Sequence, residues 1–436
     1  MSELELKVVD WLASGYGEEA ARATTGSLQI SVGEAQRVAV TEIEDSLAQT
    51  VRAHINVPLY LVAEWLLVNW WRLRWEGRPQ MPGAAWRQAH CLSGIGGDTP
   101  WPPLELFSDG DFVRLQMDAE GASDVSAIRY LRSVLADVAA SDFEAAVDRF
   151  VDVVQARLSA VLPKYRDLTE LREELTHERS SPSVSRQCRW QALAGIDPGA
   201  APDAWLLEAQ TLIDDTGPCS GDEVMGVLQD LDGGIESAKA VIDAMKGSST
   251  TVDLAWVGKH HEESPPPGEQ PWQRGARLAR ELRATHRLGE DVLDNKTLSE
   301  LVSTPVPLQG ARTKDVALGG GFRNGVSGGR ARLLVTTGRT EGQRFFLARM
   351  IGAAHVLSEA EHLVPVTRSY SALQKLERSF AQELLCPWAS LDAFTDDRGM
   401  HDEALAEAAE HFQVSEWLVR STLVNRHKLS RYRLPP

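Results

Sequence analysis

The chain has 436 residues, of which 43% are hydrophobic and 25% charged, and this composition excludes a largely disordered protein. The formal net charge of -17 argues against non-specific binding of the whole chain to nucleic acid. No apolar run is long enough to span a membrane, and the acidic start of the chain does not resemble a signal peptide. Four scattered cysteines predict neither a disulfide framework nor a cysteine zinc site. We therefore expect a cytoplasmic protein of two or three domains without a membrane partner.

Residues 1–162 predict a tryptophan-rich domain of mixed α+β structure. Short alternating runs at 28–32 and 37–41 predict strands, and residues 104–107 and 111–117 predict two more around the turn Ser108-Asp109-Gly110. A helix opened by Pro58 is expected to continue to residue 76. Ser141 begins a second amphipathic helix, and its spacing from Glu144 predicts a capping box.

The helix that follows Pro58 is unusually rich in tryptophan, and two interpretations stay open. Aromatic residues at helical spacing usually pack in a core, and this interpretation is preferred. The alternative is an aromatic platform for a partner, with arginines supplying charge. The partner-binding candidates on this helix are Trp65, Trp71, Arg72 and Arg74.

Residues 163–257 predict a helical spacer or docking domain, because apolar residues recur three and four apart with Pro and Gly between the runs. Residues 258–270 predict a Pro-rich linker. It contains His260, His261 and Glu262, which are metal-capable residue types, but their place beside a Pro-rich segment favours solvated charge.

Residues 271–436 predict further helices around a short strand at 331–336. Glycines at 319–321 and 325–329 lack a phosphate-loop pattern and predict a flexible hairpin or lid. A helix is expected at 343–355. Residues 405–425 predict two helices around a tight turn, with Ser415 as N-cap.

The helix predicted after this strand contains the sequence Arg344-Phe345-Phe346-Leu347-Ala348-Arg349-Met350-Ile351-Gly352-Ala353. This phrasing resembles the catalytic helix of the ImmA/IrrE family of bacterial zinc metallopeptidases, in which the motif is His-Glu-x-x-His. A second segment, Phe380-Ala381 followed by Leu384-Leu385-Cys386-Pro387, is similar to another hallmark of that family. The resemblance covers residues 271–436 and implies a zincin-like domain with a small sheet and a terminal helix-turn-helix-like pair.

The residues that would carry the peptidase chemistry are absent. Arg349 and Ala353 stand where the resemblance places the two zinc-binding histidines, and Met350 stands where it places the glutamate base. A guanidinium does not ligate zinc, and methionine cannot act as a base. Glu377 lies off the register expected for the third ligand. We therefore expect no catalytic residues and no cofactor at this motif, and Arg349 is instead a further candidate for partner binding.

A displaced metal site is the alternative. His355, Glu359 and His362 are spaced i, i+4 and i+7, so one helical face could present all three to a zinc ion, with Glu377 nearby. The competing interpretation is that both histidines serve packing or lie at the surface.

Together these patterns predict an α+β, mostly helical chain with a mixed α/β N-terminal domain, a helical middle and a zincin-like C-terminal domain. The favoured hypothesis is a non-catalytic regulatory protein that binds a protein partner, such as a repressor, toxin or defence component, in bacterial stress, mobile-element or phage-defence settings. The alternatives are an active metallopeptidase with relocated ligands and a DNA-associated regulator acting through the C-terminal helix pair. The oligomeric state does not follow from the sequence.

Overall fold

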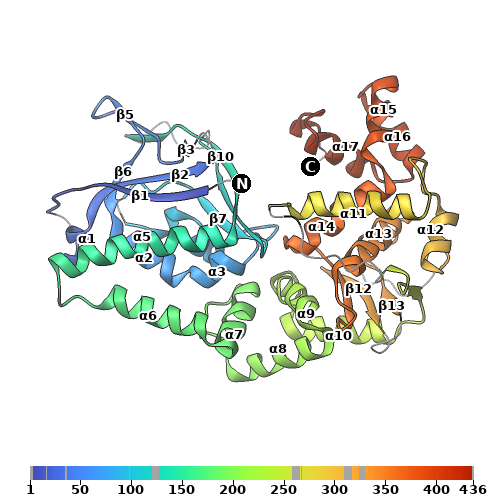
Figure 1. Ribbon diagram of the computed structural model, residues 1–436, viewed down its shortest axis with the longest axis horizontal. Coiled ribbons are helices and arrows are strands. Elements are labelled where there is room, and N and C mark those ends of the chain that lie inside the picture. The colour runs from blue at the N-terminus through green and yellow to red at the C-terminus, as the bar shows by residue number, and fades with distance from the viewer. Residues whose placement is uncertain are drawn as a thin grey trace. The chain divides into compact units, whose positions relative to one another are not determined.

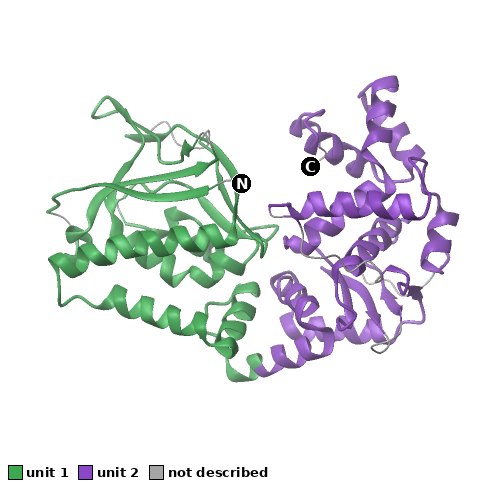
Figure 2. Cartoon of the chain, viewed as in Figure 1, with its two compact units in different colours: residues 1–206 green, residues 207–436 purple. Residues whose placement is uncertain are grey.

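The computed structural model describes the chain except for residues 1–2, 16, 35–36, 98, 120–126, 258–265, 267, 309–316, 324–328 and 435–436. The described residues form two compact units, Met1–Leu206 and Leu207–Pro436, each with its own hydrophobic core (Figure 2). Within the described ranges, four small antiparallel sheets form, and seventeen α-helices supply most of the ordered structure (Figure 1). The predicted class, α+β and mostly helical, is confirmed. None of the described helices has the length and apolarity that a membrane crossing requires.

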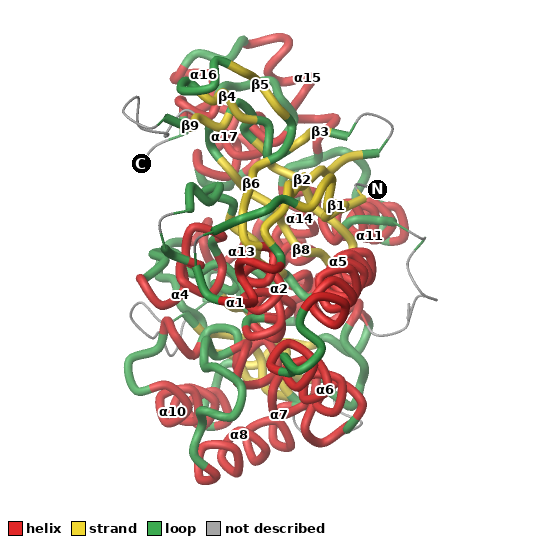
Figure 3. The backbone as a smooth tube through the Cα atoms, turned by 90° about the vertical axis from the view of Figure 1, so that its left-hand side faces the viewer, coloured by secondary structure: helices red, strands yellow, loops and turns green. Residues whose placement is uncertain are grey.

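In the described part of unit 1, three sheets and seven helices pack around one hydrophobic core. Its strands are β1 (Glu3–Trp11), β2 (Thr25–Gly33), β3 (Val38–Ala39), β4 (Ile43–Asp45), β5 (Thr50–Arg52), β6 (Ile55–Pro58), β7 (Glu105–Ser108), β8 (Phe112–Met117), β9 (Ile128–Tyr130) and β10 (Val134–Ala139). Its helices are α1 (Glu19–Ala23), α2 (Leu59–Val68), α3 (Trp70–Trp75), α4 (Ala84–His90), α5 (Ala140–Val161), α6 (Asp167–Ser180) and α7 (Pro182–Leu193). Strand β1 pairs with β2 and lies at the edge of its sheet, and α5 runs beside it (Figures 1 and 3).

Unit 2 is built around one sheet of strand order β11-β13-β12-β14, with helices on it. Its strands are β11 (Thr251–Asp253), β12 (Leu318–Arg323), β13 (Arg330–Leu334) and β14 (Leu363–Thr367). Helix α8 (Asp203–Thr216) crosses the boundary between the units. The other helices are α9 (Pro218–Met225), α10 (Gly234–Lys246), α11 (Pro271–Thr285), α12 (Asn295–Val302), α13 (Thr340–Val356), α14 (Ala372–Leu385), α15 (Trp388–Arg398), α16 (Asp402–Phe412) and α17 (Glu416–Asn425).

The segment 163–257, expected to be a helical domain of its own, divides between the two units. Helices α6 and α7 add apolar side chains to the core of unit 1, whereas α9 and α10 pack against the sheet of unit 2. Strand β11 also belongs to unit 2, because it pairs with β13. Each helix buries its apolar face on the nearest sheet, so no separate core forms. Most of the predicted linker 258–270, including His260, His261 and Glu262, lies outside the described residues.

One local prediction was wrong, and a second holds only in part. Helix α5 begins at Ala140 with Ala139 as N-cap and no side-chain cap, so Ser141 and Glu144 form no capping box. Glycines 319–321 form part of β12, which pairs antiparallel with the next strand, β13, as the hairpin alternative requires; they do not form a lid, and residues 325–328 lie outside the described part of the chain. A Cβ atom on Gly321 would lie 3.1 Å from the sulfur of Met350, so the missing side chains let α13 approach the sheet closely.

The helix predicted after Pro58 is interrupted once. Pro58 is the N-cap of α2, and Asn69 separates α2 from α3. The turn between β7 and β8 forms as predicted, with Asp109 accepting main-chain hydrogen bonds from Asp111 and Phe112. Ser415 caps α17 as expected, and its hydroxyl accepts from the Leu418 amide at 3.2 Å.

Candidate functional site

The three motif positions lie on α13, inside unit 2. Met350 and Ala353 are fully buried, and the side chain of Arg349 keeps 11% of its exposure. Helix α13 packs against α14, which begins just after β14 and is capped by Ser371. This packing brings Arg349 to a set of polar side chains from α14, from the end of β14 and from α9.

Arg349 is held by an ion pair and two hydrogen bonds. Its Nη2 lies 3.4 Å from Oε2 of Glu377, whose side chain has no exposure. The same nitrogen donates to the Thr367 carbonyl at 2.6 Å and to Oε1 of Gln374. Gln374 also donates from Nε2 to Glu377 at 3.1 Å and accepts from the Thr367 amide at 3.0 Å. Both ends of this buried amide are thereby satisfied, which fixes its orientation.

A second carboxylate and a second guanidinium complete the group. Ser369 donates to Oε2 of Glu223 at 3.1 Å, and Arg378 donates to the Ser369 carbonyl at 3.0 Å. We call Arg349, Glu377, Gln374, Glu223 and Arg378 the buried charge cluster. Its charges are taken from water, so each depends on the others for compensation.

Burial is the largest influence on the titration of the cluster. It raises the pKa of Glu377 well above the ordinary carboxyl value, although Arg349 opposes that shift. It also raises the pKa of Glu223, against the hydrogen bonds from Ser371 and Ser369. For Arg349, burial lowers the pKa to about 10, and the charge of Glu377 acts in the opposite direction. Burial therefore disfavours the charged form of each of these groups, and the neighbouring opposite charges only partly compensate for the lost solvation.

The displaced metal set does not assemble on a helix. Helix α13 ends at Val356, so Glu359 lies in an exposed turn and His362 in the chain that leads into β14. The ring of His355 is buried 5.5 Å from that of Phe380. His362 instead contacts the Asp215 carbonyl through Nδ1 at 3.1 Å. In the described part of the chain, no three His, Cys, Asp or Glu side chains are grouped to hold a metal ion. These residues do not fit zinc.

The four partner-binding candidates of unit 1 form hydrogen bonds and ion pairs within that unit. The indole of Trp65 donates to the Gln88 carbonyl at 3.0 Å, and that of Trp71 donates to Glu178 at 2.6 Å. Both rings are buried. This arrangement is that of a core helix, the interpretation preferred from the sequence.

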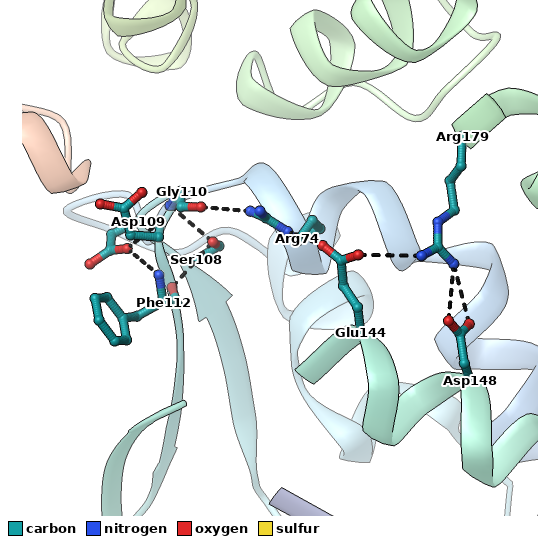
Figure 4. Close-up of polar contacts among 9 residues, drawn as sticks. Arg74, Ser108, Asp109, Gly110, Phe112, Glu144, Asp148 and Arg179 are labelled. Carbon is teal, nitrogen blue, oxygen red and sulfur yellow. Dashed lines mark hydrogen bonds and ion pairs between the residues drawn. The ribbon is translucent and has the colours of Figure 1, made fainter. Parts of the chain in front are cut away.

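The two arginines on α3 join elements of unit 1. Buried Arg72 lies 2.6 Å from the carboxylate of Glu76, which also lies 2.9 Å from the ring of His90. Arg74 pairs with Glu144 at 2.7 Å and donates to the Gly110 carbonyl at 2.7 Å. Figure 4 shows the hydrogen bond from Arg74 to Gly110. It also shows Arg179 of α6 pairing with both Glu144 and Asp148 of α5. Glu144 therefore links three helices and does not cap its own.

Two arginines of the C-terminal helix pair and its tail are paired with carboxylates. On α17, Arg420 pairs with Asp402 at 3.1 Å and with Glu416 at 3.4 Å, and Arg433 of the basic tail pairs with Asp402 at 2.7 Å. A helix that reads nucleic acid presents uncompensated basic groups to phosphate. The contacts of these arginines favour a packing role for the pair.

Sequence reasoning identified Arg349 and Glu377 but missed the rest of the cluster. Gln374 lies one helical turn before Glu377, a spacing that places both on one face of α14. Glu223 has no local signal, because 146 positions separate it from Ser369. No protein-family model, curated protein or solved structure matches this chain.

Proposed function

We propose that this protein is a non-catalytic regulator whose C-terminal unit binds a protein partner without cleaving it. The observation that carries the proposal is the ion pair between Arg349 and Glu377. A guanidinium fills a position at which the ImmA/IrrE resemblance expects a zinc ligand, and it opposes the rise in the pKa of the buried Glu377 carboxyl group that faces it. The fixed cation thus takes the electrostatic role of a metal but supplies no Lewis acid and no activated water.

The neighbouring positions support the same proposal. Met350 offers no proton acceptor where the resemblance expects a base, and its sulfur packs against the glycine strand β12. Ala353 is fully buried and offers no ligand. The partner classes implied by the resemblance are a repressor, a toxin or a defence component, which such a domain would capture or sense.

Metal content tests the absence of hydrolytic chemistry. The purified chain is expected to retain no stoichiometric zinc by mass spectrometry after dialysis with zinc. One tightly held equivalent that disappears in His355→Ala or His362→Ala would instead establish a relocated metal site.

Restoring the motif tests the resemblance itself. The triple variant Arg349→His, Met350→Glu and Ala353→His places two histidines four residues apart on α13, beside Glu377. We expect it to bind about one zinc ion, and the same variant with Glu377→Gln to bind far more weakly. Failure of the triple variant to bind zinc while folded would contradict the proposed zincin-like geometry.

Partner capture tests the regulatory role. The wild-type chain is expected to recover a protein from host extract in uncleaved form. Arg349→Ala, confirmed to be folded by circular dichroism, should weaken recovery, and Arg398→Ala, an exposed substitution in the same unit, serves as its control. Recovery of a specifically cleaved partner would refute a non-catalytic role.

A further inference from the structure

The edge of β1 and the neighbouring face of α5 form an open groove of about 480 Å³ in unit 1. Among the described residues, β1 pairs with β2 alone, so its other edge presents unpaired main-chain groups. Residues 3–8 line the groove from the strand. The helix lines it with Asp142, Ala145, Ala146, Arg149 and Val153, spaced three or four residues apart.

Strand and helix run in the same direction. Leu4 and Phe143 line one small apolar cavity, and the Arg157 guanidinium lies 5.2 Å over the ring of Trp11. Seven residues of strand span about 23 Å at about 3.3 Å each, and fourteen residues of helix span about 21 Å at about 1.5 Å each. The two elements therefore advance by nearly the same distance between these two contacts, and Glu5 lies level with Ala145.

Charged residues flank that level on both elements. On β1, Glu3 and Lys7 lie two residues to either side of Glu5. On α5, Asp142 and Arg149 lie at equal distances from the midpoint of Ala145 and Ala146. Lys7, Asp142 and Arg149 form no ion pair with other described residues. Within the groove, α5 thus has an acidic end and a basic end around a small centre, while on β1 Arg37 pairs with both Glu3 and Glu5, at 2.6 and 2.7 Å.

We propose that this face binds a second copy of the chain through a two-fold axis that passes near Glu5 and Ala145. Antiparallel pairing of β1 with the copy's β1 sets Glu3 opposite Lys7, and antiparallel packing of α5 on the copy's α5 sets Asp142 opposite Arg149. A two-fold interface must be self-complementary, and the charges of α5 satisfy that condition about the same axis that pairs β1 with its copy.

The centre of the face suits close contact. Ala145 leaves space for another helix to approach near the axis, and Val153, farther along α5, adds an apolar side chain that is 46% exposed. Glu5 would meet its own copy at the axis, but Arg37 pairs with it at 2.7 Å and offsets the repulsion. The new strand pair would extend the sheet and satisfy the free edge of β1.

Charge exchange on α5 gives the sharpest test, because Asp142 and Arg149 have no ion pair to lose among the residues that the structure describes. The wild type is expected to sediment as a dimer at micromolar concentration and low salt. Arg149→Asp sets like charges opposite each other at two symmetric places, so the dimer Kd should rise about tenfold or more. Adding Asp142→Arg restores opposite charges and should return the Kd towards the wild-type value. Lys164→Asp, an exposed substitution outside the groove, should change nothing.

Cysteine cross-linking locates the axis. In a Cys219→Ser background, which removes an exposed thiol, Glu5→Cys should form an intermolecular disulfide on oxidation with diamide, because a residue at the axis meets its own copy. Val153→Cys, off the axis, should not. A monomeric wild type at 100 micromolar, a dimer indifferent to Arg149→Asp, or equal cross-linking at both positions would overturn the proposal. Thermal unfolding of every variant confirms that it is folded.

Discussion

Glu377→Gln tests how far the fold of unit 2 depends on the ion pair beneath the motif. The side chain of Glu377 is fully buried, and that of Arg349 nearly so. Removing one member of a buried pair leaves the other charge uncompensated and costs about 3–5 kcal/mol. Arg349 keeps its hydrogen bonds to Thr367 and Gln374, so we expect the lower end of this range. In a domain of this size, about 3 kcal/mol lowers Tm by about 6–12 °C.

The assay is urea unfolding followed by circular dichroism. Arg349→Met combined with Glu377→Gln removes both charges and should recover most of the lost stability, because the variants of a coupled pair are not additive. Glu407→Gln is the matched control in the same unit, since Glu407 and Arg398 form an exposed pair with 55% exposure each. It should cost less than about 1 kcal/mol. If Glu377→Gln unfolds like the control, or the double variant loses the sum of the two singles, the cluster does not depend on charge compensation.

Three further outcomes follow from buried charge. Burial raises the pKa of Glu223, so the stability that this carboxyl group contributes is complete below pH 4.5 and is lost as the pH rises. The variant Glu223→Gln should therefore gain stability relative to the wild type between pH 4 and 8. Urea unfolding measures this difference. For Glu76 the sign is opposite, because hydrogen bonds and charge from His90 and a guanidinium outweigh the effect of burial and hold the pKa below its ordinary value. The advantage of the wild type over Glu76→Gln should be complete above pH 4.5 and fall as pH drops, in the same assay. Arg344→Met should cost about 3 kcal/mol in chemical denaturation, since it leaves buried main-chain carbonyls without a donor.

Local periodicity predicted most helices, because an apolar stripe records which face a helix buries. The helix at 343–355 corresponds to α13, and the pair at 405–425 corresponds to α16 and α17. Strand β12 was missed because glycine carries no apolar pattern. Its strand conformation comes from pairing with β13 and β14 and from the nearby helix.

The candidate site was predicted only in part, for a related reason. The sequence shows that Arg349 cannot ligate a metal, but not what it contacts instead. Gln374 comes from the next helix, and Glu223 comes from a segment assigned to a different domain. Similarly, Glu144 has the spacing of a cap but is drawn to Arg74 and Arg179 from other helices. Long-range charge partners of this kind leave no trace in local spacing.

The pairing of β11 with β13 has a consequence for limited proteolysis. Strand β11 precedes residues 258–270 in the chain, yet it belongs to the same sheet as the strands that follow them. A protease that cuts within 258–270 would therefore yield two fragments that stay associated until denaturant is added. A truncated protein starting at residue 271 would lose that edge strand, together with α9 and Glu223, and would be a poor substitute for the intact unit.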